Sequence, residues 1–432
     1  MLHSSLFRKY LPGACMLLWA TGVAYGQTDT LFLKKTMPYG QYIDRVGKHN
    51  IAYAAEKFNI PVAAANIEAA KIFPDPELSA GWFDNGQRRL NMGNGYSAGI
   101  GWTVELGGKR KARIDLAKSE SELAGYLLQD YFRNLRAEAT LKYLEAIRNG
   151  QLVQVQFQAY DAMNRLAQSD SIRAHSGAIS DLDARQSRLE AATMRNDVYQ
   201  AIADWKTSLS ELAVFTGTLT SDTLMVASGN FTPFDRNFEL ARLVSDARQY
   251  RADLAAALQD KTVAEKMLAL AKASRVIDLG LSAGLTYASY VRNAIAPTPS
   301  FVQTNLGLSI PLKFSNNNRG ALKTAYYTTL QTEARYQQAA LQVQAEVTQA
   351  FFNYQATRQQ ALQFNTGLLA GAQIILEGKL YSYRRGETSL LEVLNAQRTY
   401  NEVQQNYYQT LFNCAAALVA LEKAAGIWDI NF

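Results

Sequence analysis

The sequence predicts a mainly α-helical protein with a small β part, in which very long helices and four strands form two repeats. Three observations lead to this fold class. Short motifs recur along the 432 residues at an offset of about 209, two stretches of roughly 65 residues contain no proline, and four segments alternate apolar and small polar residues. Such patterns are typical of coiled helices joined to amphipathic strands.

Composition excludes several classes of protein. The hydrophobic fraction of 48% is ample for a folded core. Two cysteines cannot build a disulfide framework, and three histidines supply few ligands for a catalytic metal centre. The net charge of +6 is small for this length and the basic residues are scattered. We therefore expect no cofactor, no bound metal and no nucleic-acid partner.

Residues 1–26 have the pattern of a secretory signal peptide. Arg8 and Lys9 precede an apolar run from Cys15 to Tyr25, and small residues at 24 and 26 permit cleavage before Gln27. A lipid anchor on Cys15 is the alternative, which is disfavoured because the apolar run follows this cysteine instead of preceding it. No later stretch of roughly 18 uncharged apolar residues exists, so we expect export without a helical anchor.

Repetition divides the rest of the chain. The tetrapeptide at Gly177–Ser180 matches that at Gly386–Ser389, and Thr216-Gly217 matches Ala425-Gly426, both at an offset of 209. Between these points runs a helical seam in which Cys414 takes the place of Trp205, so we expect Cys414 to be a buried apolar residue. The predicted divisions are a signal peptide 1–26, a first repeat 27–217, a linker 218–236, a second repeat 237–426 and a tail 427–432.

Each repeat contains two predicted strands, 76–84 and 96–106 in the first and 279–290 and 302–312 in the second. One face of each strand is apolar and the other consists mainly of glycine and small polar residues. Strands of about 9–11 residues have the length needed to cross a bilayer when tilted, and this alternation fits a barrel between lipid and water. A soluble sandwich, with the apolar face buried, is the alternative.

The long helices follow the strands. Proline is absent from about Gly108 to Ser171 and from about Arg319 to Tyr383. A helix of roughly 65 residues would extend about 97 Å, and a second helix returns after each glycine turn. Four strands cannot close a barrel and lipid does not tolerate an open sheet edge, so the chain must be an oligomer. Three copies would supply twelve strands and a ring of twelve long helices.

The turns carry the most specific motif, the run YRRGETSLLEVLNAQ from Tyr383 to Gln397, whose Gly-x-x-Ser core recurs in the first repeat. With the segment PDPELS at 74–79, this run resembles the TolC family of outer-membrane efflux ducts over nearly the whole mature chain. The resemblance implies a homotrimer with a shared 12-stranded outer-membrane β-barrel and a periplasmic α-barrel. It also implies a periplasmic adaptor and an inner-membrane pump as partners, and passive conduction of their substrates to the exterior.

Two segments resemble the heavy-metal-efflux branch of this family, which works with RND-type pumps. They are ELGGKR at 105–110 and PLKFSNNNRG at 311–320, each directly after a predicted strand. A multidrug or type I protein-secretion duct is the alternative within the family. A periplasmic coiled-coil scaffold is a more remote alternative, because it would not need two hairpins of bilayer length.

The resemblance also implies functional residues at the helical tip. Glu392 falls on an aspartate of the family motif, and Asp183 is its equivalent in the first repeat, so three chains would form a cation-attracting ring of carboxylates. Asn395 stands where other members carry a second aspartate, and Tyr383 matches a tyrosine that latches the closed tip. Solvated helix acids and seam packing are the alternative interpretations. The predicted adaptor-docking turns contain Gly177, Ser180, Gly386 and Ser389, which otherwise serve only as helix caps.

Cationic residues lie near both ends of the predicted strands. Arg88 and Arg89, in the loop Asp84–Gly95, would face the exterior and contact anionic lipopolysaccharide or water. A basic cluster follows the second strand at the inner membrane face, where it could meet lipid phosphates or simply be exposed to water. Its members are Lys109, Arg110, Lys111 and Arg113.

The candidate catalytic motifs lack the structural context that such motifs need. Two Gly-x-Ser-x-Gly matches, at Ser97 and Ser282, lie inside continuing strand alternation instead of a sharp strand-to-helix turn. A phosphate-binding loop of the Gly-x-x-x-x-Gly-Lys type is missing. The sequence therefore predicts a protein that is not an enzyme and that depends on a partner for energy.

Overall fold

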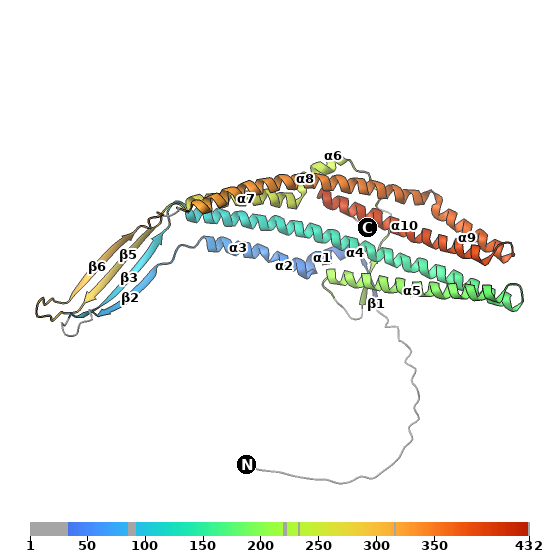
Figure 1. Cartoon of the computed structure of the whole chain (residues 1–432), viewed down its shortest axis with the longest axis horizontal. Coiled ribbons are helices and arrows are strands. Elements are labelled where there is room, and N and C mark those ends of the chain that lie inside the picture. Colours follow the sequence, from blue (N-terminus) through green and yellow to red (C-terminus); the bar gives the residue numbers. More distant parts are fainter. Residues whose placement is uncertain (1–32, 85–91, 219–222, 232–233, 315–316, 431–432) are drawn as a thin grey trace, which may run out of the picture.

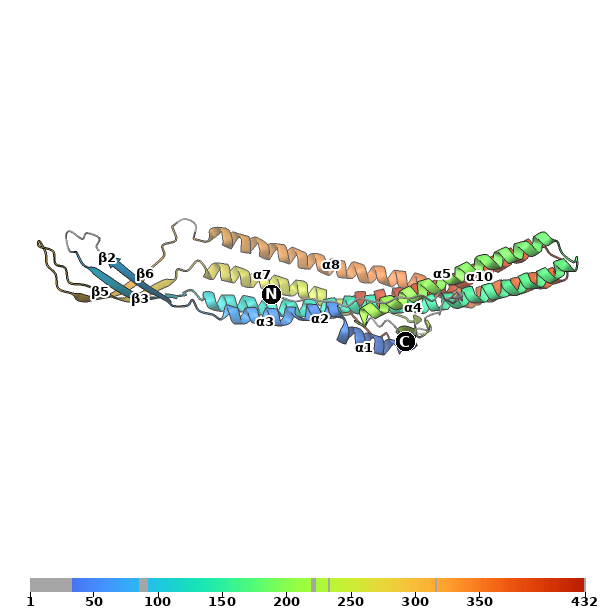
Figure 2. The same ribbon diagram turned by 90° about the horizontal axis from the view of Figure 1, so that it is seen from below.

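The structure is a computed structural model that describes residues 33–84, 92–218, 223–231, 234–314 and 317–430. The molecule is elongated, with a small sheet at one end, a bundle of long helices in the middle and two helical hairpins at the other end (Figure 1). Seen after a quarter turn, the strands and helices still follow one long axis (Figure 2). The predicted mainly α fold class, with a small β part at the end of long helices, is confirmed.

The larger sheet contains one strand pair from each repeat. Its strands are β2 (Glu77–Asp84), β3 (Asn94–Val104), β5 (Leu279–Ala288) and β6 (Phe301–Ser309), antiparallel in the order β2-β3-β5-β6. Each overlaps its predicted range. The register aligns Leu78, Ile100, Ala283 and Leu306 across the sheet, so the apolar faces of all four strands lie on one side. The sheet leaves β2 and β6 as its edges.

The first long helix, α4 (Lys109–His175), runs unbroken for 67 residues. The prediction of an equally continuous helix over Arg319–Tyr383 is wrong. A π-helical turn, Phe364–Leu368, separates α8 (Arg319–Gln363) from α9 (Leu369–Arg384). Gly367 has a φ of 111° inside this turn, which a glycine adopts without steric cost. Because a glycine and not a proline causes this break, the absence of proline from the stretch did not exclude it.

Shorter helices complete each repeat. In the first, α1 (Tyr39–His49), α2 (Ile51–Lys57) and α3 (Asn59–Ala70) precede the strands, and α5 (Asp181–Phe215) returns from the tip. In the second, the equivalents are α6 (Leu240–Tyr250), α7 (Ala252–Ala273) and α10 (Leu390–Ala425). Among the described helices, none is both long and apolar enough to span a bilayer.

A second, smaller sheet was not predicted. Strand β1 (Leu33–Pro38) pairs in parallel with β4 (Thr223–Ser228), which lies within 218–236, where the sequence predicts only a linker. The hydroxyl of Tyr143, on α4, lies 2.7 Å from the carbonyl oxygens of both Met37, near the end of β1, and Ser228, at the end of β4. Tyr143 is fully buried, so this sheet is tied to the middle of the long helix.

The main core surrounds this middle section, where α1, α4, α8 and α10 meet. Cys414 of α10 is buried there, as its place in the helical seam predicts, and burial raises the pKa of its thiol to about 11. Tyr354 of α8 repeats the arrangement of Tyr143, because its hydroxyl lies 2.7 Å from the carbonyl oxygen of Phe234. Both long helices are thus anchored to connecting segments through buried tyrosines.

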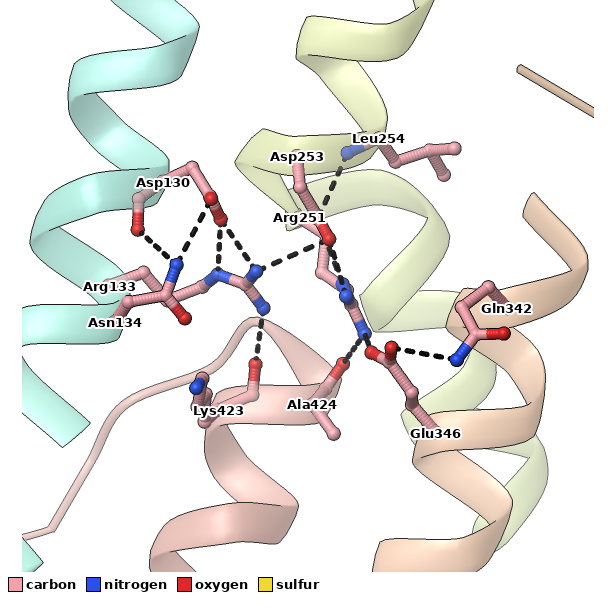
Figure 3. A network of polar contacts seen from close by, with 10 residues as sticks. All are labelled: Asp130, Arg133, Asn134, Arg251, Asp253, Leu254, Gln342, Glu346, Lys423 and Ala424. Carbon is pink, nitrogen blue, oxygen red and sulfur yellow. Dashed lines mark hydrogen bonds and ion pairs between the residues drawn. The ribbon is translucent and has the colours of Figure 1, made fainter. Parts of the chain in front are cut away.

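A charged network holds the end of α10 against three other helices (Figure 3). Arg251, only 4% exposed between α6 and α7, donates to the carbonyl oxygen of Ala424 (3.1 Å) and pairs with Glu346 of α8 (2.7 Å). Arg133 of α4 donates to the carbonyl oxygen of Lys423 (2.8 Å). These cations satisfy carbonyls that a helix C-terminus leaves free and complement its negative dipole end.

In the first repeat, a neutral residue binds a carbonyl oxygen at the equivalent helix end. Asn50, between α1 and α2, donates its side-chain amide to the carbonyl oxygen of Phe215 (3.1 Å). Phe215 and Ala424 are separated by the repeat offset of 209, and each is followed by a glycine with positive φ at the helix end, Gly217 or Gly426. The duplication therefore preserves the position of the cap but not its chemistry.

Candidate functional site at the helical tip

The tip is formed by the turns of the two hairpins, α4–α5 and α9–α10, which reach the same end of the molecule (Figure 1). Gly177 and Gly386 end the descending helices with φ values of 74° and 78°. Ser180 and Ser389 then cap the returning helices, each hydroxyl accepting from the backbone N–H three residues later (3.0 and 3.4 Å). The capping interpretation of these four residues is therefore correct, and their contact with an adaptor stays a prediction.

The two predicted gate carboxylates each interact within their own hairpin. Asp183 accepts a hydrogen bond from the Ser180 hydroxyl (2.8 Å). Glu392 pairs with Lys379 of α9 (2.5 Å), and this hydrogen bond lowers the pKa of Glu392. Asn395 is exposed one turn further along α10. Because Lys379 offsets the charge of Glu392, the α9–α10 hairpin contributes less net negative charge to the tip than the sequence suggests.

Tyr383 joins the two hairpins. It is 5% exposed on α9, and its hydroxyl donates to Oδ1 of Asp170 on α4 (3.0 Å), a carboxylate with no exposed surface. The guanidinium of Arg173 lies over the Tyr383 ring (5.0 Å), with Nη1 3.8 Å from the same Oδ1. Burial raises the pKa of Asp170, because the charged form loses hydration. The predicted latch tyrosine therefore has a specific, buried acidic partner.

A small apolar core surrounds Tyr383 and is separate from the main core. Its members come from all four helices of the tip, and most of those on α4 and α5 are alanine or methionine. The other buried members are Ala159, Met163, Leu166, Ala167, Ala191, Met194, Leu390, Val393 and Leu394. Because this core is small, polar links carry a larger share of the contact between the hairpins than they do in the middle of the molecule.

Sequence reasoning missed Asp170, although a signal existed. Asp170 follows Met163, Leu166 and Ala167 at helical spacing, which places an acid on the buried face of α4. Sequence reasoning also missed an ion pair between Arg398 of α10 and Glu190 of α5, because the sequence around neither residue indicates it. Spacing along one helix does not identify a partner on another.

The basic residues after β3 mostly hold the sheet–helix junction. Lys109 is buried and pairs with Asp278 (2.6 Å), and Arg113 binds both carboxylate oxygens of Glu105 (2.8 and 3.1 Å). Lys109 and Arg113 therefore use their charges inside the chain, which neither lipid contact nor simple exposure to water had predicted. Arg88 and Arg89 lie outside the described residues.

The described residues offer no group of three or more histidine, cysteine, aspartate and glutamate side chains able to hold a metal ion. Ser97 and Ser282 lie in the middle of β3 and β5, paired with Thr286 and Gly101 respectively. The strand context that argues against a nucleophile elbow is therefore present at both serines.

Comparison with known proteins agrees with this architecture. The sequence model of the family described as outer membrane efflux protein matches residues 43–218 and 243–427, the two repeats. The chain is 22% identical over 380 residues to the cobalt-zinc-cadmium resistance protein CzcC of Cupriavidus metallidurans, covering 86% of this chain and 88% of that protein. It is 23% identical over 416 residues to the pyoverdine export outer membrane protein OpmQ of Pseudomonas putida, covering 89% and 84%. A crystal structure of CusC superposes with a TM-score of 0.75 at 17% identity, covering 92% of this chain and 94% of that one.

Proposed function

Because the chain belongs to the outer membrane efflux protein family, we propose that it is the exit duct of a tripartite efflux system. The chain is an outer-membrane efflux channel with a large periplasmic portion. In the proposed system it passively conducts substrates that an RND-type inner-membrane pump delivers through a periplasmic adaptor. The duct itself has no catalytic role and takes its energy from the pump.

The main support for this proposal comes from the two edge strands of the large sheet. Its four strands present one continuous apolar face, while the edges β2 and β6 have no second partner strand among the residues that the structure describes. An unpaired edge is not tolerated in lipid, where backbone groups have no water to bind. Three copies that pair the β6 of one chain with the β2 of the next would close a twelve-stranded barrel and bring three tips together.

In such a trimer the tip would act as the gate. The buried bond between Tyr383 and Asp170 supports a closed resting state, because it holds α9 against α4. Asp183 and Glu392 would supply six carboxylates near the axis, with Lys379 moderating the field of Glu392. The glycine turns, exposed at the end of the molecule, are the proposed docking surface for the adaptor.

For the cargo we propose heavy-metal cations. The support is the match to CzcC along most of both chains, together with the ELGGKR segment that leads from β3 into α4. A second candidate is an organic siderophore, since the match to the pyoverdine export protein OpmQ has a similar extent.

Two experiments test this function. Heat-modifiable migration as a trimer in the outer-membrane fraction is the expected result, and a soluble periplasmic monomer would overturn the duct. For the cargo, the chain is expressed with the pump and adaptor encoded beside its gene in a host that lacks its own ducts. Raised tolerance of cobalt, zinc or cadmium is expected, whereas siderophore export with unchanged metal tolerance would favour the second candidate.

A further inference from the structure

A second polar link joins the two tip hairpins. Arg398 of α10 donates from Nε and Nη2 to the two carboxylate oxygens of Glu190 on α5, at 3.0 and 2.9 Å. This is the two-bond, fork-to-fork geometry that makes an arginine–carboxylate pair directional. The Glu190 side chain is only 16% exposed and the Arg398 side chain is 59% exposed, so the pair lies at the rim of the hairpin contact.

Arg398 reaches across the hairpins although a nearer partner exists. Glu402 stands four residues later on α10, the spacing at which an acid and a base pair along one helix. The guanidinium instead binds Glu190, which is 208 residues away in sequence. The geometry therefore favours a contact between elements over a local helix pair.

The two links are complementary in position. Tyr383–Asp170 joins α9 to α4, whereas Arg398–Glu190 joins α10 to α5. Glu190 lies ten residues beyond the cap Ser180, which corresponds to about 15 Å along α5. One link alone would let a hairpin rotate about the bond, but two links on different helix pairs oppose both rotation and separation.

We infer that Glu190 and Arg398 are positioning residues of the gate, which together with Tyr383–Asp170 hold the tip narrow. This inference rests on the proposed function. The part that would move is the α9–α10 hairpin, because the π-helical turn around Gly367 interrupts the helix directly above α9. Release of both links would free this hairpin from α4–α5 without disturbing the main core.

The test measures single-channel conductance of the trimer in a planar bilayer. Arg398→Gln should raise the resting conductance at least twofold, and its combination with Tyr383→Phe should raise it by more than the product of the two single effects. The charge-exchanged double variant, Glu190→Arg with Arg398→Glu, should return the conductance toward that of the original chain. Arg195→Gln is the matched control, because Arg195 is an exposed cation on α5 and the change removes the same charge.

A crosslinking experiment distinguishes a positioning role of this pair from a purely stabilising one. Glu190→Cys with Arg398→Cys, joined by a bifunctional methanethiosulfonate crosslinker that spans the length of the ion pair, should show lowered conductance, and reduction of the crosslink should reverse the effect. Thermal unfolding of the same trimers should change little, since the main core is untouched. Conductance that is insensitive to Arg398→Gln, to the double variant and to the crosslink would overturn the inference. An original trimer that forms no pore would instead overturn the proposed function.

Discussion

Removal of the Tyr383 hydroxyl tests the latch most directly. Tyr383→Phe keeps the ring in its small core but leaves Oδ1 of the fully buried Asp170 without its 3.0 Å donor. The remaining cation, Arg173, is 3.8 Å away, and within the described residues Oδ2 of Asp170 has no hydrogen-bond partner. A hydrogen bond to a charged group contributes about 1.5–3 kcal/mol, which the variant loses in each protomer.

That loss predicts a large change in gating. A difference of about 1.5–3 kcal/mol shifts the ratio of closed to open tips by roughly ten- to a hundredfold per protomer. The factors multiply if the three protomers of a trimer open together. Single-channel conductance in a planar bilayer is the assay, with longer and more frequent openings as the expected result.

Tyr381→Phe is the matched control for this prediction. Tyr381 lies two residues away, is 60% exposed, and accepts a hydrogen bond from Arg385 at the surface. Its loss should leave the conductance unchanged. Equal conductance for Tyr383→Phe and the original chain would refute the latch, and so would an equal increase for both variants.

The remaining predictions concern pH, selectivity and stability. Burial raises the pKa of Asp170 in the closed tip. The stabilisation that protonated Asp170 gives to the closed tip is therefore fully present below the ordinary aspartate pKa and is lost as pH rises through the raised pKa. Acidification should reduce openings, and Asp170→Asn should abolish this pH dependence. Glu392→Gln should lower cation preference in reversal-potential measurements, and unchanged selectivity would remove Glu392 from the ring. Arg251→Gln should destabilise the chain by about 2–3 kcal/mol in denaturant unfolding, because the end of α10 loses its cap and Glu346 loses its partner; a loss below about 0.5 kcal/mol would contradict this account. Gly367→Ala should destabilise by about 1–2 kcal/mol because of its φ of 111°, whereas Gly371→Ala, in the regular part of α9, should be neutral or stabilising.

Much of the fold follows from local periodicity. A period of two along four segments identifies the strands of the large sheet, and their shared apolar face follows directly from the alternation. The glycine turns at the tip were predictable because only glycine adopts the left-handed conformation at helix ends without strain. The repeat offset of 209 likewise locates Cys414 on a buried seam, because equal spacing gives equal faces.

Other features escape sequence reasoning for physical reasons. Strands β1 and β4 have six residues each and pair across about 190 residues of intervening chain, so neither has a local signal of its own. The break at Gly367 occurs in a stretch that lacks proline, and an isolated glycine is compatible with a continuous helix.

The sequence alone determined the two repeats, the length of the strands in the large sheet and the length of the first long helix, because each depends on spacing along the sequence. Only the tertiary structure decided which side chains meet. It paired Tyr383 with Asp170 and Arg398 with Glu190, and it assigned Lys379 to Glu392. These contacts depend on how separate helices pack side by side, which no periodicity within a single helix specifies.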